Sequence, residues 1–402
     1  MQSDSQHLGE EYIKLSFGME EYFPGYVDAY YGPEEWKIQA NQDGKPPLDV
    51  LTKRTSQLAD DVFKADMDEQ RKDFLIRQIG AMQMSQRLLA GEKVSLAEEV
   101  EAIYDVRPEW KDEASFEEAH KELDALLPQG GSLTERQQAW KSSLEISIEK
   151  SRELFPYVIR TCRELASKKF NIPNGESFSL ELVNDKPWMA YNWYLGNMQS
   201  RIDINTDIPV YINMIAPMIS HEGYPGHHTE LTIKEQKLVK EKGYYEHTIA
   251  LINSPSCVIS EGIAMIALDT IFSDTELEDW YRDELLPRAG MSHVDAKRML
   301  KIVKANDKMM GISGNISFML YDERKSESEV EKYLQKYALA TDREIKQMIR
   351  FVSDPPSRSY VFTYDVGYDL LMELFTLGDR DAYLTRLFEE PVTPSQIRQW
   401  IN

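Results

Sequence analysis

Apolar residues recur at helical spacing through most of this chain, and no other feature narrows its possible folds as far. Typical helix starts accompany the pattern, such as the capping boxes Ser132-x-x-Glu135 and Ser326-x-x-Glu329, in which side chains satisfy free backbone N–H groups. We therefore expect a mainly α (α+β) protein. The pattern predicts long helices at about 54–92, 132–168, 207–224, 255–273, 292–310, 326–337 and 358–376.

The chain is long enough to bury a large core, since it has 402 residues, of which 42% are hydrophobic and 28% charged. Single cores seldom grow beyond roughly 250–300 residues, so one large domain and two lobes both fit this length. We expect an N-terminal helical lobe at 1–170 and a second lobe, with the motifs described below, at 171–402. One continuous domain with a cleft is the alternative.

Charge and composition exclude several classes of partner. With 46 Lys+Arg against 68 Asp+Glu, the formal charge is −22, so we expect no nucleic-acid partner. No run of 18 apolar residues occurs, which predicts no membrane-spanning helix. Two cysteines are too few for a disulfide framework, and the N-terminus lacks the basic and apolar regions of a signal peptide. These features predict a cytoplasmic protein.

One region, from Ser177 to Thr206, departs from the helical pattern. Aromatic and β-branched residues alternate or cluster there in three segments separated by turn formers, at 178–183, 188–194 and 200–205. They predict a small antiparallel sheet directly before the segment with the strongest functional motif. The segment 200–205 could offer an edge to an extended peptide, and an ordinary sheet edge is equally compatible.

A histidine and a glutamate, His221 and Glu222, lie on the core-facing side of a predicted helix. In the zinc-hydrolase motif H-E-x-x-H, two histidines four residues apart leave the same helix face and bind one zinc, while the glutamate acts on bound water. Here Pro225 holds the fourth position and cannot be a ligand. Proline also lacks the N–H that a helix needs, so we expect the helix to break between Tyr224 and His227.

Two histidines follow the proline, His227 and His228, and either could supply the second ligand. On an unbroken helix His227 would point about 120° away from His221, and His228 would lie about 10 Å further along the axis. A break that brings the chain back by two residues would place His227 where the second histidine of H-E-x-x-H normally lies. We therefore prefer His227 as the second ligand, with His228 as the alternative. Three of the seven histidines lie close together, which favours a metal site over histidines that only satisfy hydrogen bonds.

A second predicted helix carries a single carboxylate in apolar surroundings. Ser254 and Pro255 are typical of a cap and a first helical residue, and Glu261 is the only charge before Asp269. A buried ionised carboxylate costs several kcal/mol unless a cation or a metal compensates it. A glutamate from a second helix is the third zinc ligand in the gluzincin branch, and Gly262 beside it would let two backbones approach closely. An ion pair with Arg or Lys is the alternative.

Together these motifs resemble the bacterial domain-of-unknown-function family 885, whose pattern is H-E-x-x-P-G-H followed by E-G-W-A. They are similar, more distantly, to helical zinc peptidases of the thimet oligopeptidase and thermostable carboxypeptidase kind. The resemblance implies a zincin-like fold and a metallopeptidase activity. Ile263 replaces the usual Trp, and an expected acidic residue is displaced to Asp269. The matching segments are 221–228, 260–262, 23–26, 30–33 and 364–367.

The sequence thus predicts a zinc-dependent hydrolase. His221, His227 and Glu261 would hold Zn²⁺ and leave one coordination position for water, whose pKa falls to near 7 on the metal. Glu222 would take the proton of that water, and the resulting hydroxide would attack a carbonyl group.

Tyr364 and Arg358 are candidate donors to the oxyanion that forms, although tyrosines at helical spacing more often serve packing. We expect a peptide or peptide-like substrate. A metal hydrolase of a small amide or ester is one alternative, and a non-catalytic helical protein with a structural metal is another. Glu222 separates these classes, because a structural site closed by four protein ligands needs no adjacent base.

Overall fold

Hydroxyl caps explain where several helices begin in the computed structural model, which describes residues 2–42, 44–186, 188–354 and 357–402. At Ser132 and Ser326 the hydroxyl accepts a hydrogen bond from the backbone N–H three residues later. The glutamate at that later position accepts in turn from the backbone N–H of the serine, as predicted. The same reciprocal pair occurs at Ser273, Thr341 and Thr393. The protein is mainly α with small sheets, which confirms the predicted fold class.

The part of the chain before residue 171 is almost entirely helical. Two predicted helices, 54–92 and 132–168, are each divided in two. The first is divided because Asp68 caps a new helix, and the second because a short strand separates its two halves. The elements are α1 (Gln2–Glu20), β1 (Val27–Tyr30), α2 (Glu34–Asn41), α3 (Leu48–Lys64), α4 (Glu69–Leu89), α5 (Leu96–Tyr104), α6 (Glu113–Leu126), α7 (Leu133–Ser143), β2 (Glu145–Ile146) and α8 (Ile148–Lys169).

In the second part of the chain, strands come first and helices follow. The helix predicted at 207–224 begins later, because residues 210–211 pair with β2 instead. The elements are β3 (Ser177–Val183), β4 (Ala190–Gly196), β5 (Gln199–Asn205), β6 (Val210–Tyr211), α9 (Ile212–Glu222), α10 (His227–Lys234), η1 (Glu235–Glu241), η2 (Tyr245–Thr248), β7 (Ile249–Leu251), α11 (Pro255–Met265), α12 (Ala267–Ile271), α13 (Asp274–Trp280), η3 (Tyr281–Leu285), α14 (Leu286–Arg288), α15 (Ala296–Asp307), α16 (Ile312–Tyr321), α17 (Glu327–Tyr337), α18 (Asp342–Ser353), α19 (Ser357–Tyr360), α20 (Phe362–Phe375), α21 (Arg380–Glu389) and α22 (Pro394–Ile401).

The three predicted strands form one sheet in the order β3-β5-β4. Strands β4 and β5 are antiparallel, as predicted, whereas β3 runs parallel to β5, so this sheet is mixed. The expectation that 200–205 offers a free edge is wrong, because β5 is the central strand. The edge strand β4 lies beside α9, where the Asn192 side-chain amide donates to the backbone carbonyl of Glu222 at 2.6 Å.

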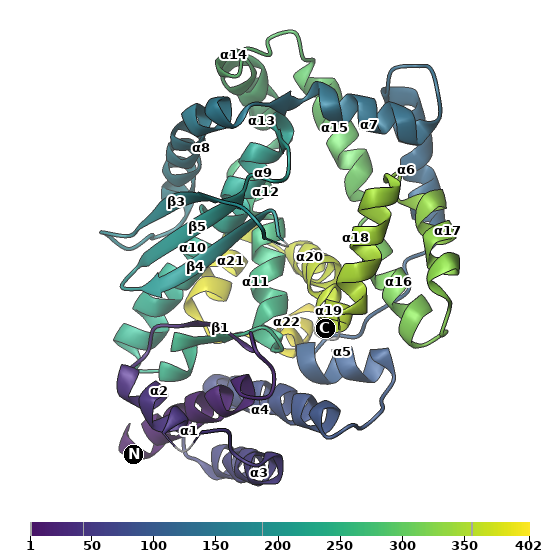
Figure 1. Ribbon diagram of the computed structural model, residues 1–402. Helices are drawn as coiled ribbons and strands as arrows, with labels where there is room; N and C mark the ends of the chain where they lie inside the picture. Colours follow the sequence, from purple (N-terminus) through teal and green to yellow (C-terminus); the bar gives the residue numbers. More distant parts are fainter. Residues whose placement is uncertain (1, 43, 187, 355–356) are drawn as a thin grey trace.

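Helix α11 runs through the middle of the molecule, between the sheet on one side and α16–α18 on the other (Figure 1). It packs very closely against α20. A Cβ added at Gly262 would lie 2.8 Å from the carbonyl oxygen of Gly367, and one added at Gly367 would lie 2.6 Å from that of Val258. No real Cβ fits such gaps, so the two glycines permit this contact, as the sequence predicted for Gly262.

The early and late parts of the chain share hydrophobic clusters. One cluster joins residues of α1, α3 and α4 to Ile249 and Leu251 of β7, and β1 pairs antiparallel with that same strand. A second cluster joins Val100 of α5 to Val258 of α11 and Phe362 of α20. These contacts bring N-terminal residues close to α11, and the division of the chain at residue 170 stays a prediction.

Candidate metal centre

Helix α9 carries the His-Glu motif, and its packing determines where the motif lies. Ile212, Ile215 and Ile219 are completely buried on one side of this helix. His221, in its last turn, keeps 22% of its side chain exposed, while Glu222 ends the helix and is 8% exposed. The motif is therefore at the inner end of a buried helix, with the histidine partly accessible.

The helix breaks where the sequence predicted, since α9 ends at Glu222 and α10 begins at His227. The turn that contains Pro225 folds tightly back onto α9. A Cβ added at Gly226 would lie 1.9 Å from the carbonyl oxygen of His221, so only glycine fits at this position. This close return places His227 beside His221, with ring centroids 4.8 Å apart and ring planes perpendicular.

The three predicted ligands come together from three helices: His221 from α9, His227 from α10 and Glu261 from α11. One nitrogen or oxygen atom of each lies within 4.8 Å of the others. Nε2 of His221 is 3.6 Å from Oε2 of Glu261, and Nε2 of His227 is 3.9 Å from its Oε1. Two imidazole nitrogens and a carboxylate oxygen make up a donor set that zinc prefers.

Hydrogen bonds fix the orientation of the His227 ring. Its Nδ1 lies 3.0 Å from Oγ of Ser260, and that hydroxyl donates to Oε2 of Glu230 at 2.6 Å. Because the Ser260 proton points to Glu230, the Ser260 oxygen accepts from Nδ1–H of His227. The other ring nitrogen, Nε2, then carries the lone pair and faces Glu261. Lys234 extends this series of hydrogen bonds, because its ammonium group donates to Oε1 of Glu230 at 2.5 Å.

Burial keeps both imidazole rings neutral. It lowers the pKa of His221 to about 3, with a further contribution from His227, and a hydrogen bond to the backbone of Ala264 opposes this shift. Burial also lowers the pKa of His227 to about 4. Since a histidine must be deprotonated to bind a metal, both rings are in the required form at neutral pH.

Two glutamates beside these rings bind protons more tightly than usual. Burial, together with the nearby carboxylates of Glu261 and Asp28, raises the pKa of Glu222 to about 8. Burial raises the pKa of Glu261 to about 7, although the hydrogen bond from Tyr360 opposes the shift. Both shifts arise mainly from burial, and neighbouring carboxylates without a compensating cation add to them.

Tyr360 contacts the cluster, although sequence reasoning gave it no role. Its hydroxyl donates to Oε1 of Glu261 at 2.8 Å. The predicted candidate, Tyr364, meets Tyr360 edge to face with ring centroids 5.7 Å apart. Burial raises the pKa of Tyr364, and the carboxylates of Glu261 and Glu222 contribute, so Tyr364 also borders the cluster. The stripe of tyrosines was visible in the sequence, but the member that reaches Glu261 depends on how α19 meets α20.

His228 points away from the cluster. It is completely buried, with Nδ1 2.8 Å from Oγ of Ser200 and Nε2 2.8 Å from Oε2 of Glu176. Both ring nitrogens therefore have partners on the sheet side of α10. This geometry opposes the alternative in which His228 replaces His227 as a ligand.

Arg358 was expected beside the ligands, and the structure corrects this placement. Its Nε donates to Oε1 of Glu99 in α5 at 3.1 Å, and its guanidinium group lies over the ring of Tyr321. Glu99 is 3% exposed, so this is a buried anchor between α19 and α5. Because these contacts occupy the guanidinium group, Arg358 is not available as a donor to the oxyanion.

Asp28 is a second residue that sequence reasoning missed. It lies in β1 at the irregularity in the pairing of this strand with β7. Such a bulge leaves one residue outside the ladder and redirects its side chain. The charge of Asp28 raises the pKa of both Glu222 and Glu261, so its carboxylate faces the same space. The sequence held no sign of this, because Asp28 is far from Glu222 and Glu261 along the chain.

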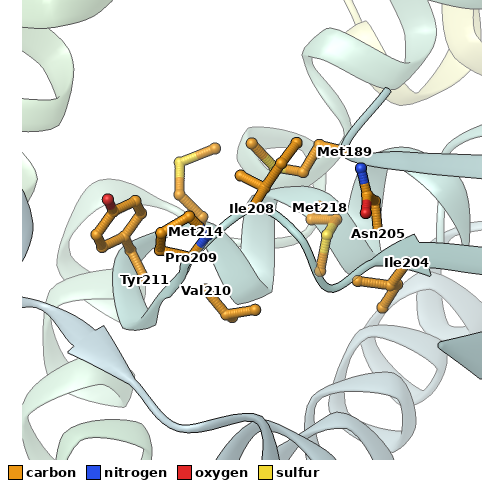
Figure 2. A pocket seen from close by; sticks show the side chains of 9 residues that line it. All are labelled: Met189, Ile204, Asn205, Ile208, Pro209, Val210, Tyr211, Met214 and Met218. Carbon is orange, nitrogen blue, oxygen red and sulfur yellow. The ribbon is translucent and has the colours of Figure 1, made fainter. Parts of the chain in front are cut away.

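A small hollow beside the start of α9 is separate from this chemistry (Figure 2). Its volume is ≈ 10 Å³, about the space of one water molecule. None of the three predicted ligands lines it, so we interpret it as a packing gap between the sheet and α9. Its lining side chains are Met189, Ile204, Asn205, Ile208, Pro209, Val210, Tyr211, Met214 and Met218.

Three solved structures are similar to this chain to different degrees. A protein described as "the putative lipoprotein from Colwellia psychrerythraea" has a TM-score of 0.52 at 13% identity, covering 91% of this chain and 72% of that chain. A "putative lipoprotein of unknown function" from Shewanella oneidensis has a TM-score of 0.49 at 9% identity, covering 90% and 75%. A protein named BsuCP has a TM-score of 0.43 at 10% identity, covering 99% and 90%.

The first of these likenesses shows a shared fold, and at such low identity it shows nothing further. No protein-family model matches the chain, and no curated protein matches it. Within the described ranges, no helix is long and apolar enough to cross a membrane.

Proposed function

We propose that this chain is a zinc-dependent hydrolase that cleaves peptide amide bonds, a metallopeptidase of the gluzincin type. The observation that carries the proposal is the convergence of His221, His227 and Glu261 from three helices, with Glu222 directly after the first ligand. This is the only group of its kind among the residues that the structure describes. The cytoplasmic location expected from the sequence stays a prediction.

The residues present fit a zinc ion. Oε2 of Glu261 is buried and has no hydrogen-bond partner among the described residues, while Nε2 of His221 faces it at 3.6 Å. A cation between them would compensate a carboxylate that is otherwise costly to ionise. The donors number three, whereas a structural zinc site is closed by four protein ligands. Three donors therefore favour a catalytic site with one open position.

Zinc held by these residues would act as a Lewis acid and make a water molecule acidic enough to lose a proton near neutral pH. Glu222 is the residue placed to take that proton. Its side chain is buried, and the positive charge of a bound zinc would oppose the rise in its pKa and keep it as a carboxylate that can accept a proton. The Asn192 bond to its backbone carbonyl holds this end of α9 against β4.

Other side chains would orient the substrate and support the developing charge. Tyr364 borders both Glu222 and Glu261, so its hydroxyl is our candidate donor to the oxyanion. Tyr360 orients Glu261 through its hydrogen bond instead. The edge strand β4 lies next to α9, so we place the backbone of an extended peptide along it in preference to the central strand β5.

The proposal is tested by pairing metal analysis with digestion of a peptide library. The protein is purified without chelator and without added metal, its zinc content is measured, and its products are identified by mass spectrometry. We expect zinc in the purified protein and cleavage that stops on chelation and returns with zinc. Zinc-loaded, folded protein that cleaves no peptide in the library would reject the peptidase assignment.

A further inference from the structure

An open pocket of ≈ 390 Å³ adjoins the proposed catalytic centre. Two of its lining residues connect it to that centre. The ring of Tyr364 meets that of Tyr360, whose hydroxyl donates to Glu261, and Met265 follows Glu261 by about one helical turn on α11. The remaining walls come from the end of α15, the start of α16, and α18 and α20. A substrate bound at the cluster would therefore have this pocket within reach of a side chain.

The pocket carries negative charge and no positive charge of its own. Its lining includes Asp307 and Asp365 but no lysine, arginine or histidine. Asp365 is only 3% exposed, and its Oδ1 has no hydrogen-bond partner among the described residues. The nearby Lys111 does not fill this role, because its ammonium group pairs with Asp369. Asp365 is thus a buried carboxylate with an unused acceptor at the pocket wall, which calls for a donor from a ligand.

The rest of the lining is apolar and adaptable. Four methionines, Met265, Met309, Met310 and Met348, contribute to the walls. Unbranched thioether side chains adjust to flexible aliphatic chains. The side chains of lysine and arginine have the matching character, since an aliphatic stem ends in a charged head. The negatively charged end of the pocket and its methionine walls therefore complement the side chains of lysine and arginine.

We propose that this pocket is a specificity subsite that takes the side chain of a lysine or arginine residue in the peptide substrate. The inference rests on the proposed peptidase function and names the substrate class of the same site. The aliphatic stem lies against the methionines, and the cationic head donates to Oδ1 of Asp365. Asp307, which is exposed at the pocket, adds attraction for the incoming cation.

Binding can be measured apart from catalysis by using the zinc-loaded Glu222→Gln protein and short alanine peptides. Each peptide carries one lysine, arginine, norleucine or glutamate, moved through every position. Norleucine retains the stem of lysine but lacks the charge. At the position that enters the pocket, we expect lysine and arginine peptides to bind about ten- to hundredfold more tightly than the norleucine peptide, by calorimetry.

Two variants locate the preference in this pocket. In the Glu222→Gln background, Asp365→Asn should reduce the preference for lysine over norleucine to about twofold or less, with norleucine affinity unchanged. Asp307→Asn should reduce the preference for lysine over norleucine partially. This variant should fold, because Asp307 is exposed. Asp66→Asn is the matched control, because it makes the same change in net charge at an exposed residue that does not line the pocket.

The outcomes separate this inference from the proposed function. Equal affinity for lysine and norleucine peptides at every position would overturn the subsite, as would a preference that survives Asp307→Asn and folded Asp365→Asn undiminished. Cleavage by the wild-type enzyme without a cationic preference would remove the subsite and leave the peptidase function standing. Pocket-dependent binding of lysine peptides that zinc-loaded wild-type protein never cleaves would support the subsite and reject the peptidase function.

Discussion

The hydroxyl of Tyr360 donates to Oε1 of Glu261 at 2.8 Å, although the two residues belong to different helices, α19 and α11. The bond leaves Oε2 of Glu261 without a hydrogen-bond partner in the described part of the chain, facing Nε2 of His221 at 3.6 Å. One oxygen is therefore used to orient the carboxylate, and the other is available to a metal. This division of roles gives each residue near the cluster a distinct expected phenotype.

We expect about one zinc per chain, lost when a proposed ligand is removed. His221→Ala, His227→Ala and Glu261→Ala should each lower the zinc content by more than about tenfold after dialysis against a weak chelator. Metal analysis by mass spectrometry measures this, and circular dichroism checks folding. His293→Ala is the control, since His293 is exposed and outside the cluster. Full occupancy in all three folded variants would exclude this ligand set.

Glu222→Gln should separate catalysis from metal binding. The amide has the same shape as the carboxyl group, and the three ligands are untouched, so zinc content and folding should stay near wild type. The rate should fall by about 10²–10⁴, as for loss of a general base. Steady-state kinetics on a cleaved peptide measures the change. A variant that hydrolyses this peptide at the wild-type rate would contradict the role given to Glu222.

The two tyrosines should differ in what their removal changes. Tyr360→Phe removes the hydrogen bond that orients Glu261, so zinc affinity should fall by about tenfold or more. Tyr364→Phe should leave zinc affinity unchanged and lower kcat, because its hydroxyl supports the oxyanion. Competition with a chromogenic chelator gives the affinities, and peptide kinetics gives kcat. The reverse pattern would exchange the roles of the two residues.

Gly226→Ala should destabilise the protein strongly. The added Cβ would lie 1.9 Å from the carbonyl oxygen of His221, and backbone atoms on both sides must move. We expect a loss of about 3 kcal/mol or more in the free energy of unfolding, with loss of zinc. Urea unfolding provides the measurement. Gly80→Ala is the matched control, because nothing lies within 4 Å of its added Cβ in α4 and alanine favours a helix by about 1 kcal/mol.

Without metal, stability should depend on pH through Glu222. Its pKa in the folded protein is raised from 4.5 to about 8, so the folded state binds this proton more tightly than the unfolded state. The resulting stabilisation is complete below pH 4.5 and is lost as the pH rises through about 8. His221 acts in the opposite direction, since its pKa is lowered from 6.5 to about 3 and its contribution is lost as the pH falls through that range.

Thermal unfolding of the chelator-treated protein at several pH values checks this dependence. Wild type should lose stability between about pH 4.5 and pH 8 relative to Glu222→Gln, in which the side chain carries no charge at any of these values. Equal pH profiles for the two proteins would show that Glu222 is not held in the buried, proton-binding state described above.

The sequence alone predicted the helical class and the capped helix starts, because periodicity and caps are local properties. It also predicted the break around Pro225, where the missing N–H is followed at once by Gly226, whereas Pro156 and Pro217 lie inside continuous helices. His227 followed from counting residues across that break. Helix boundaries were less well predicted, and β6 at 210–211 shows why, because its partner β2 lies far away in the sequence.

The tertiary structure decided which side chains face one another. The sequence showed tyrosines at helical spacing, but only the way α19 meets α20, which packs against α11, brings Tyr360 to Glu261. Arg358 has the chemistry of an oxyanion donor, yet a buried partner, Glu99, occupies it. Asp28 reaches the cluster because β1 pairs with β7, just before α11. Local propensities depend on neighbours in the chain, whereas such contacts depend on how distant segments bury their apolar faces together.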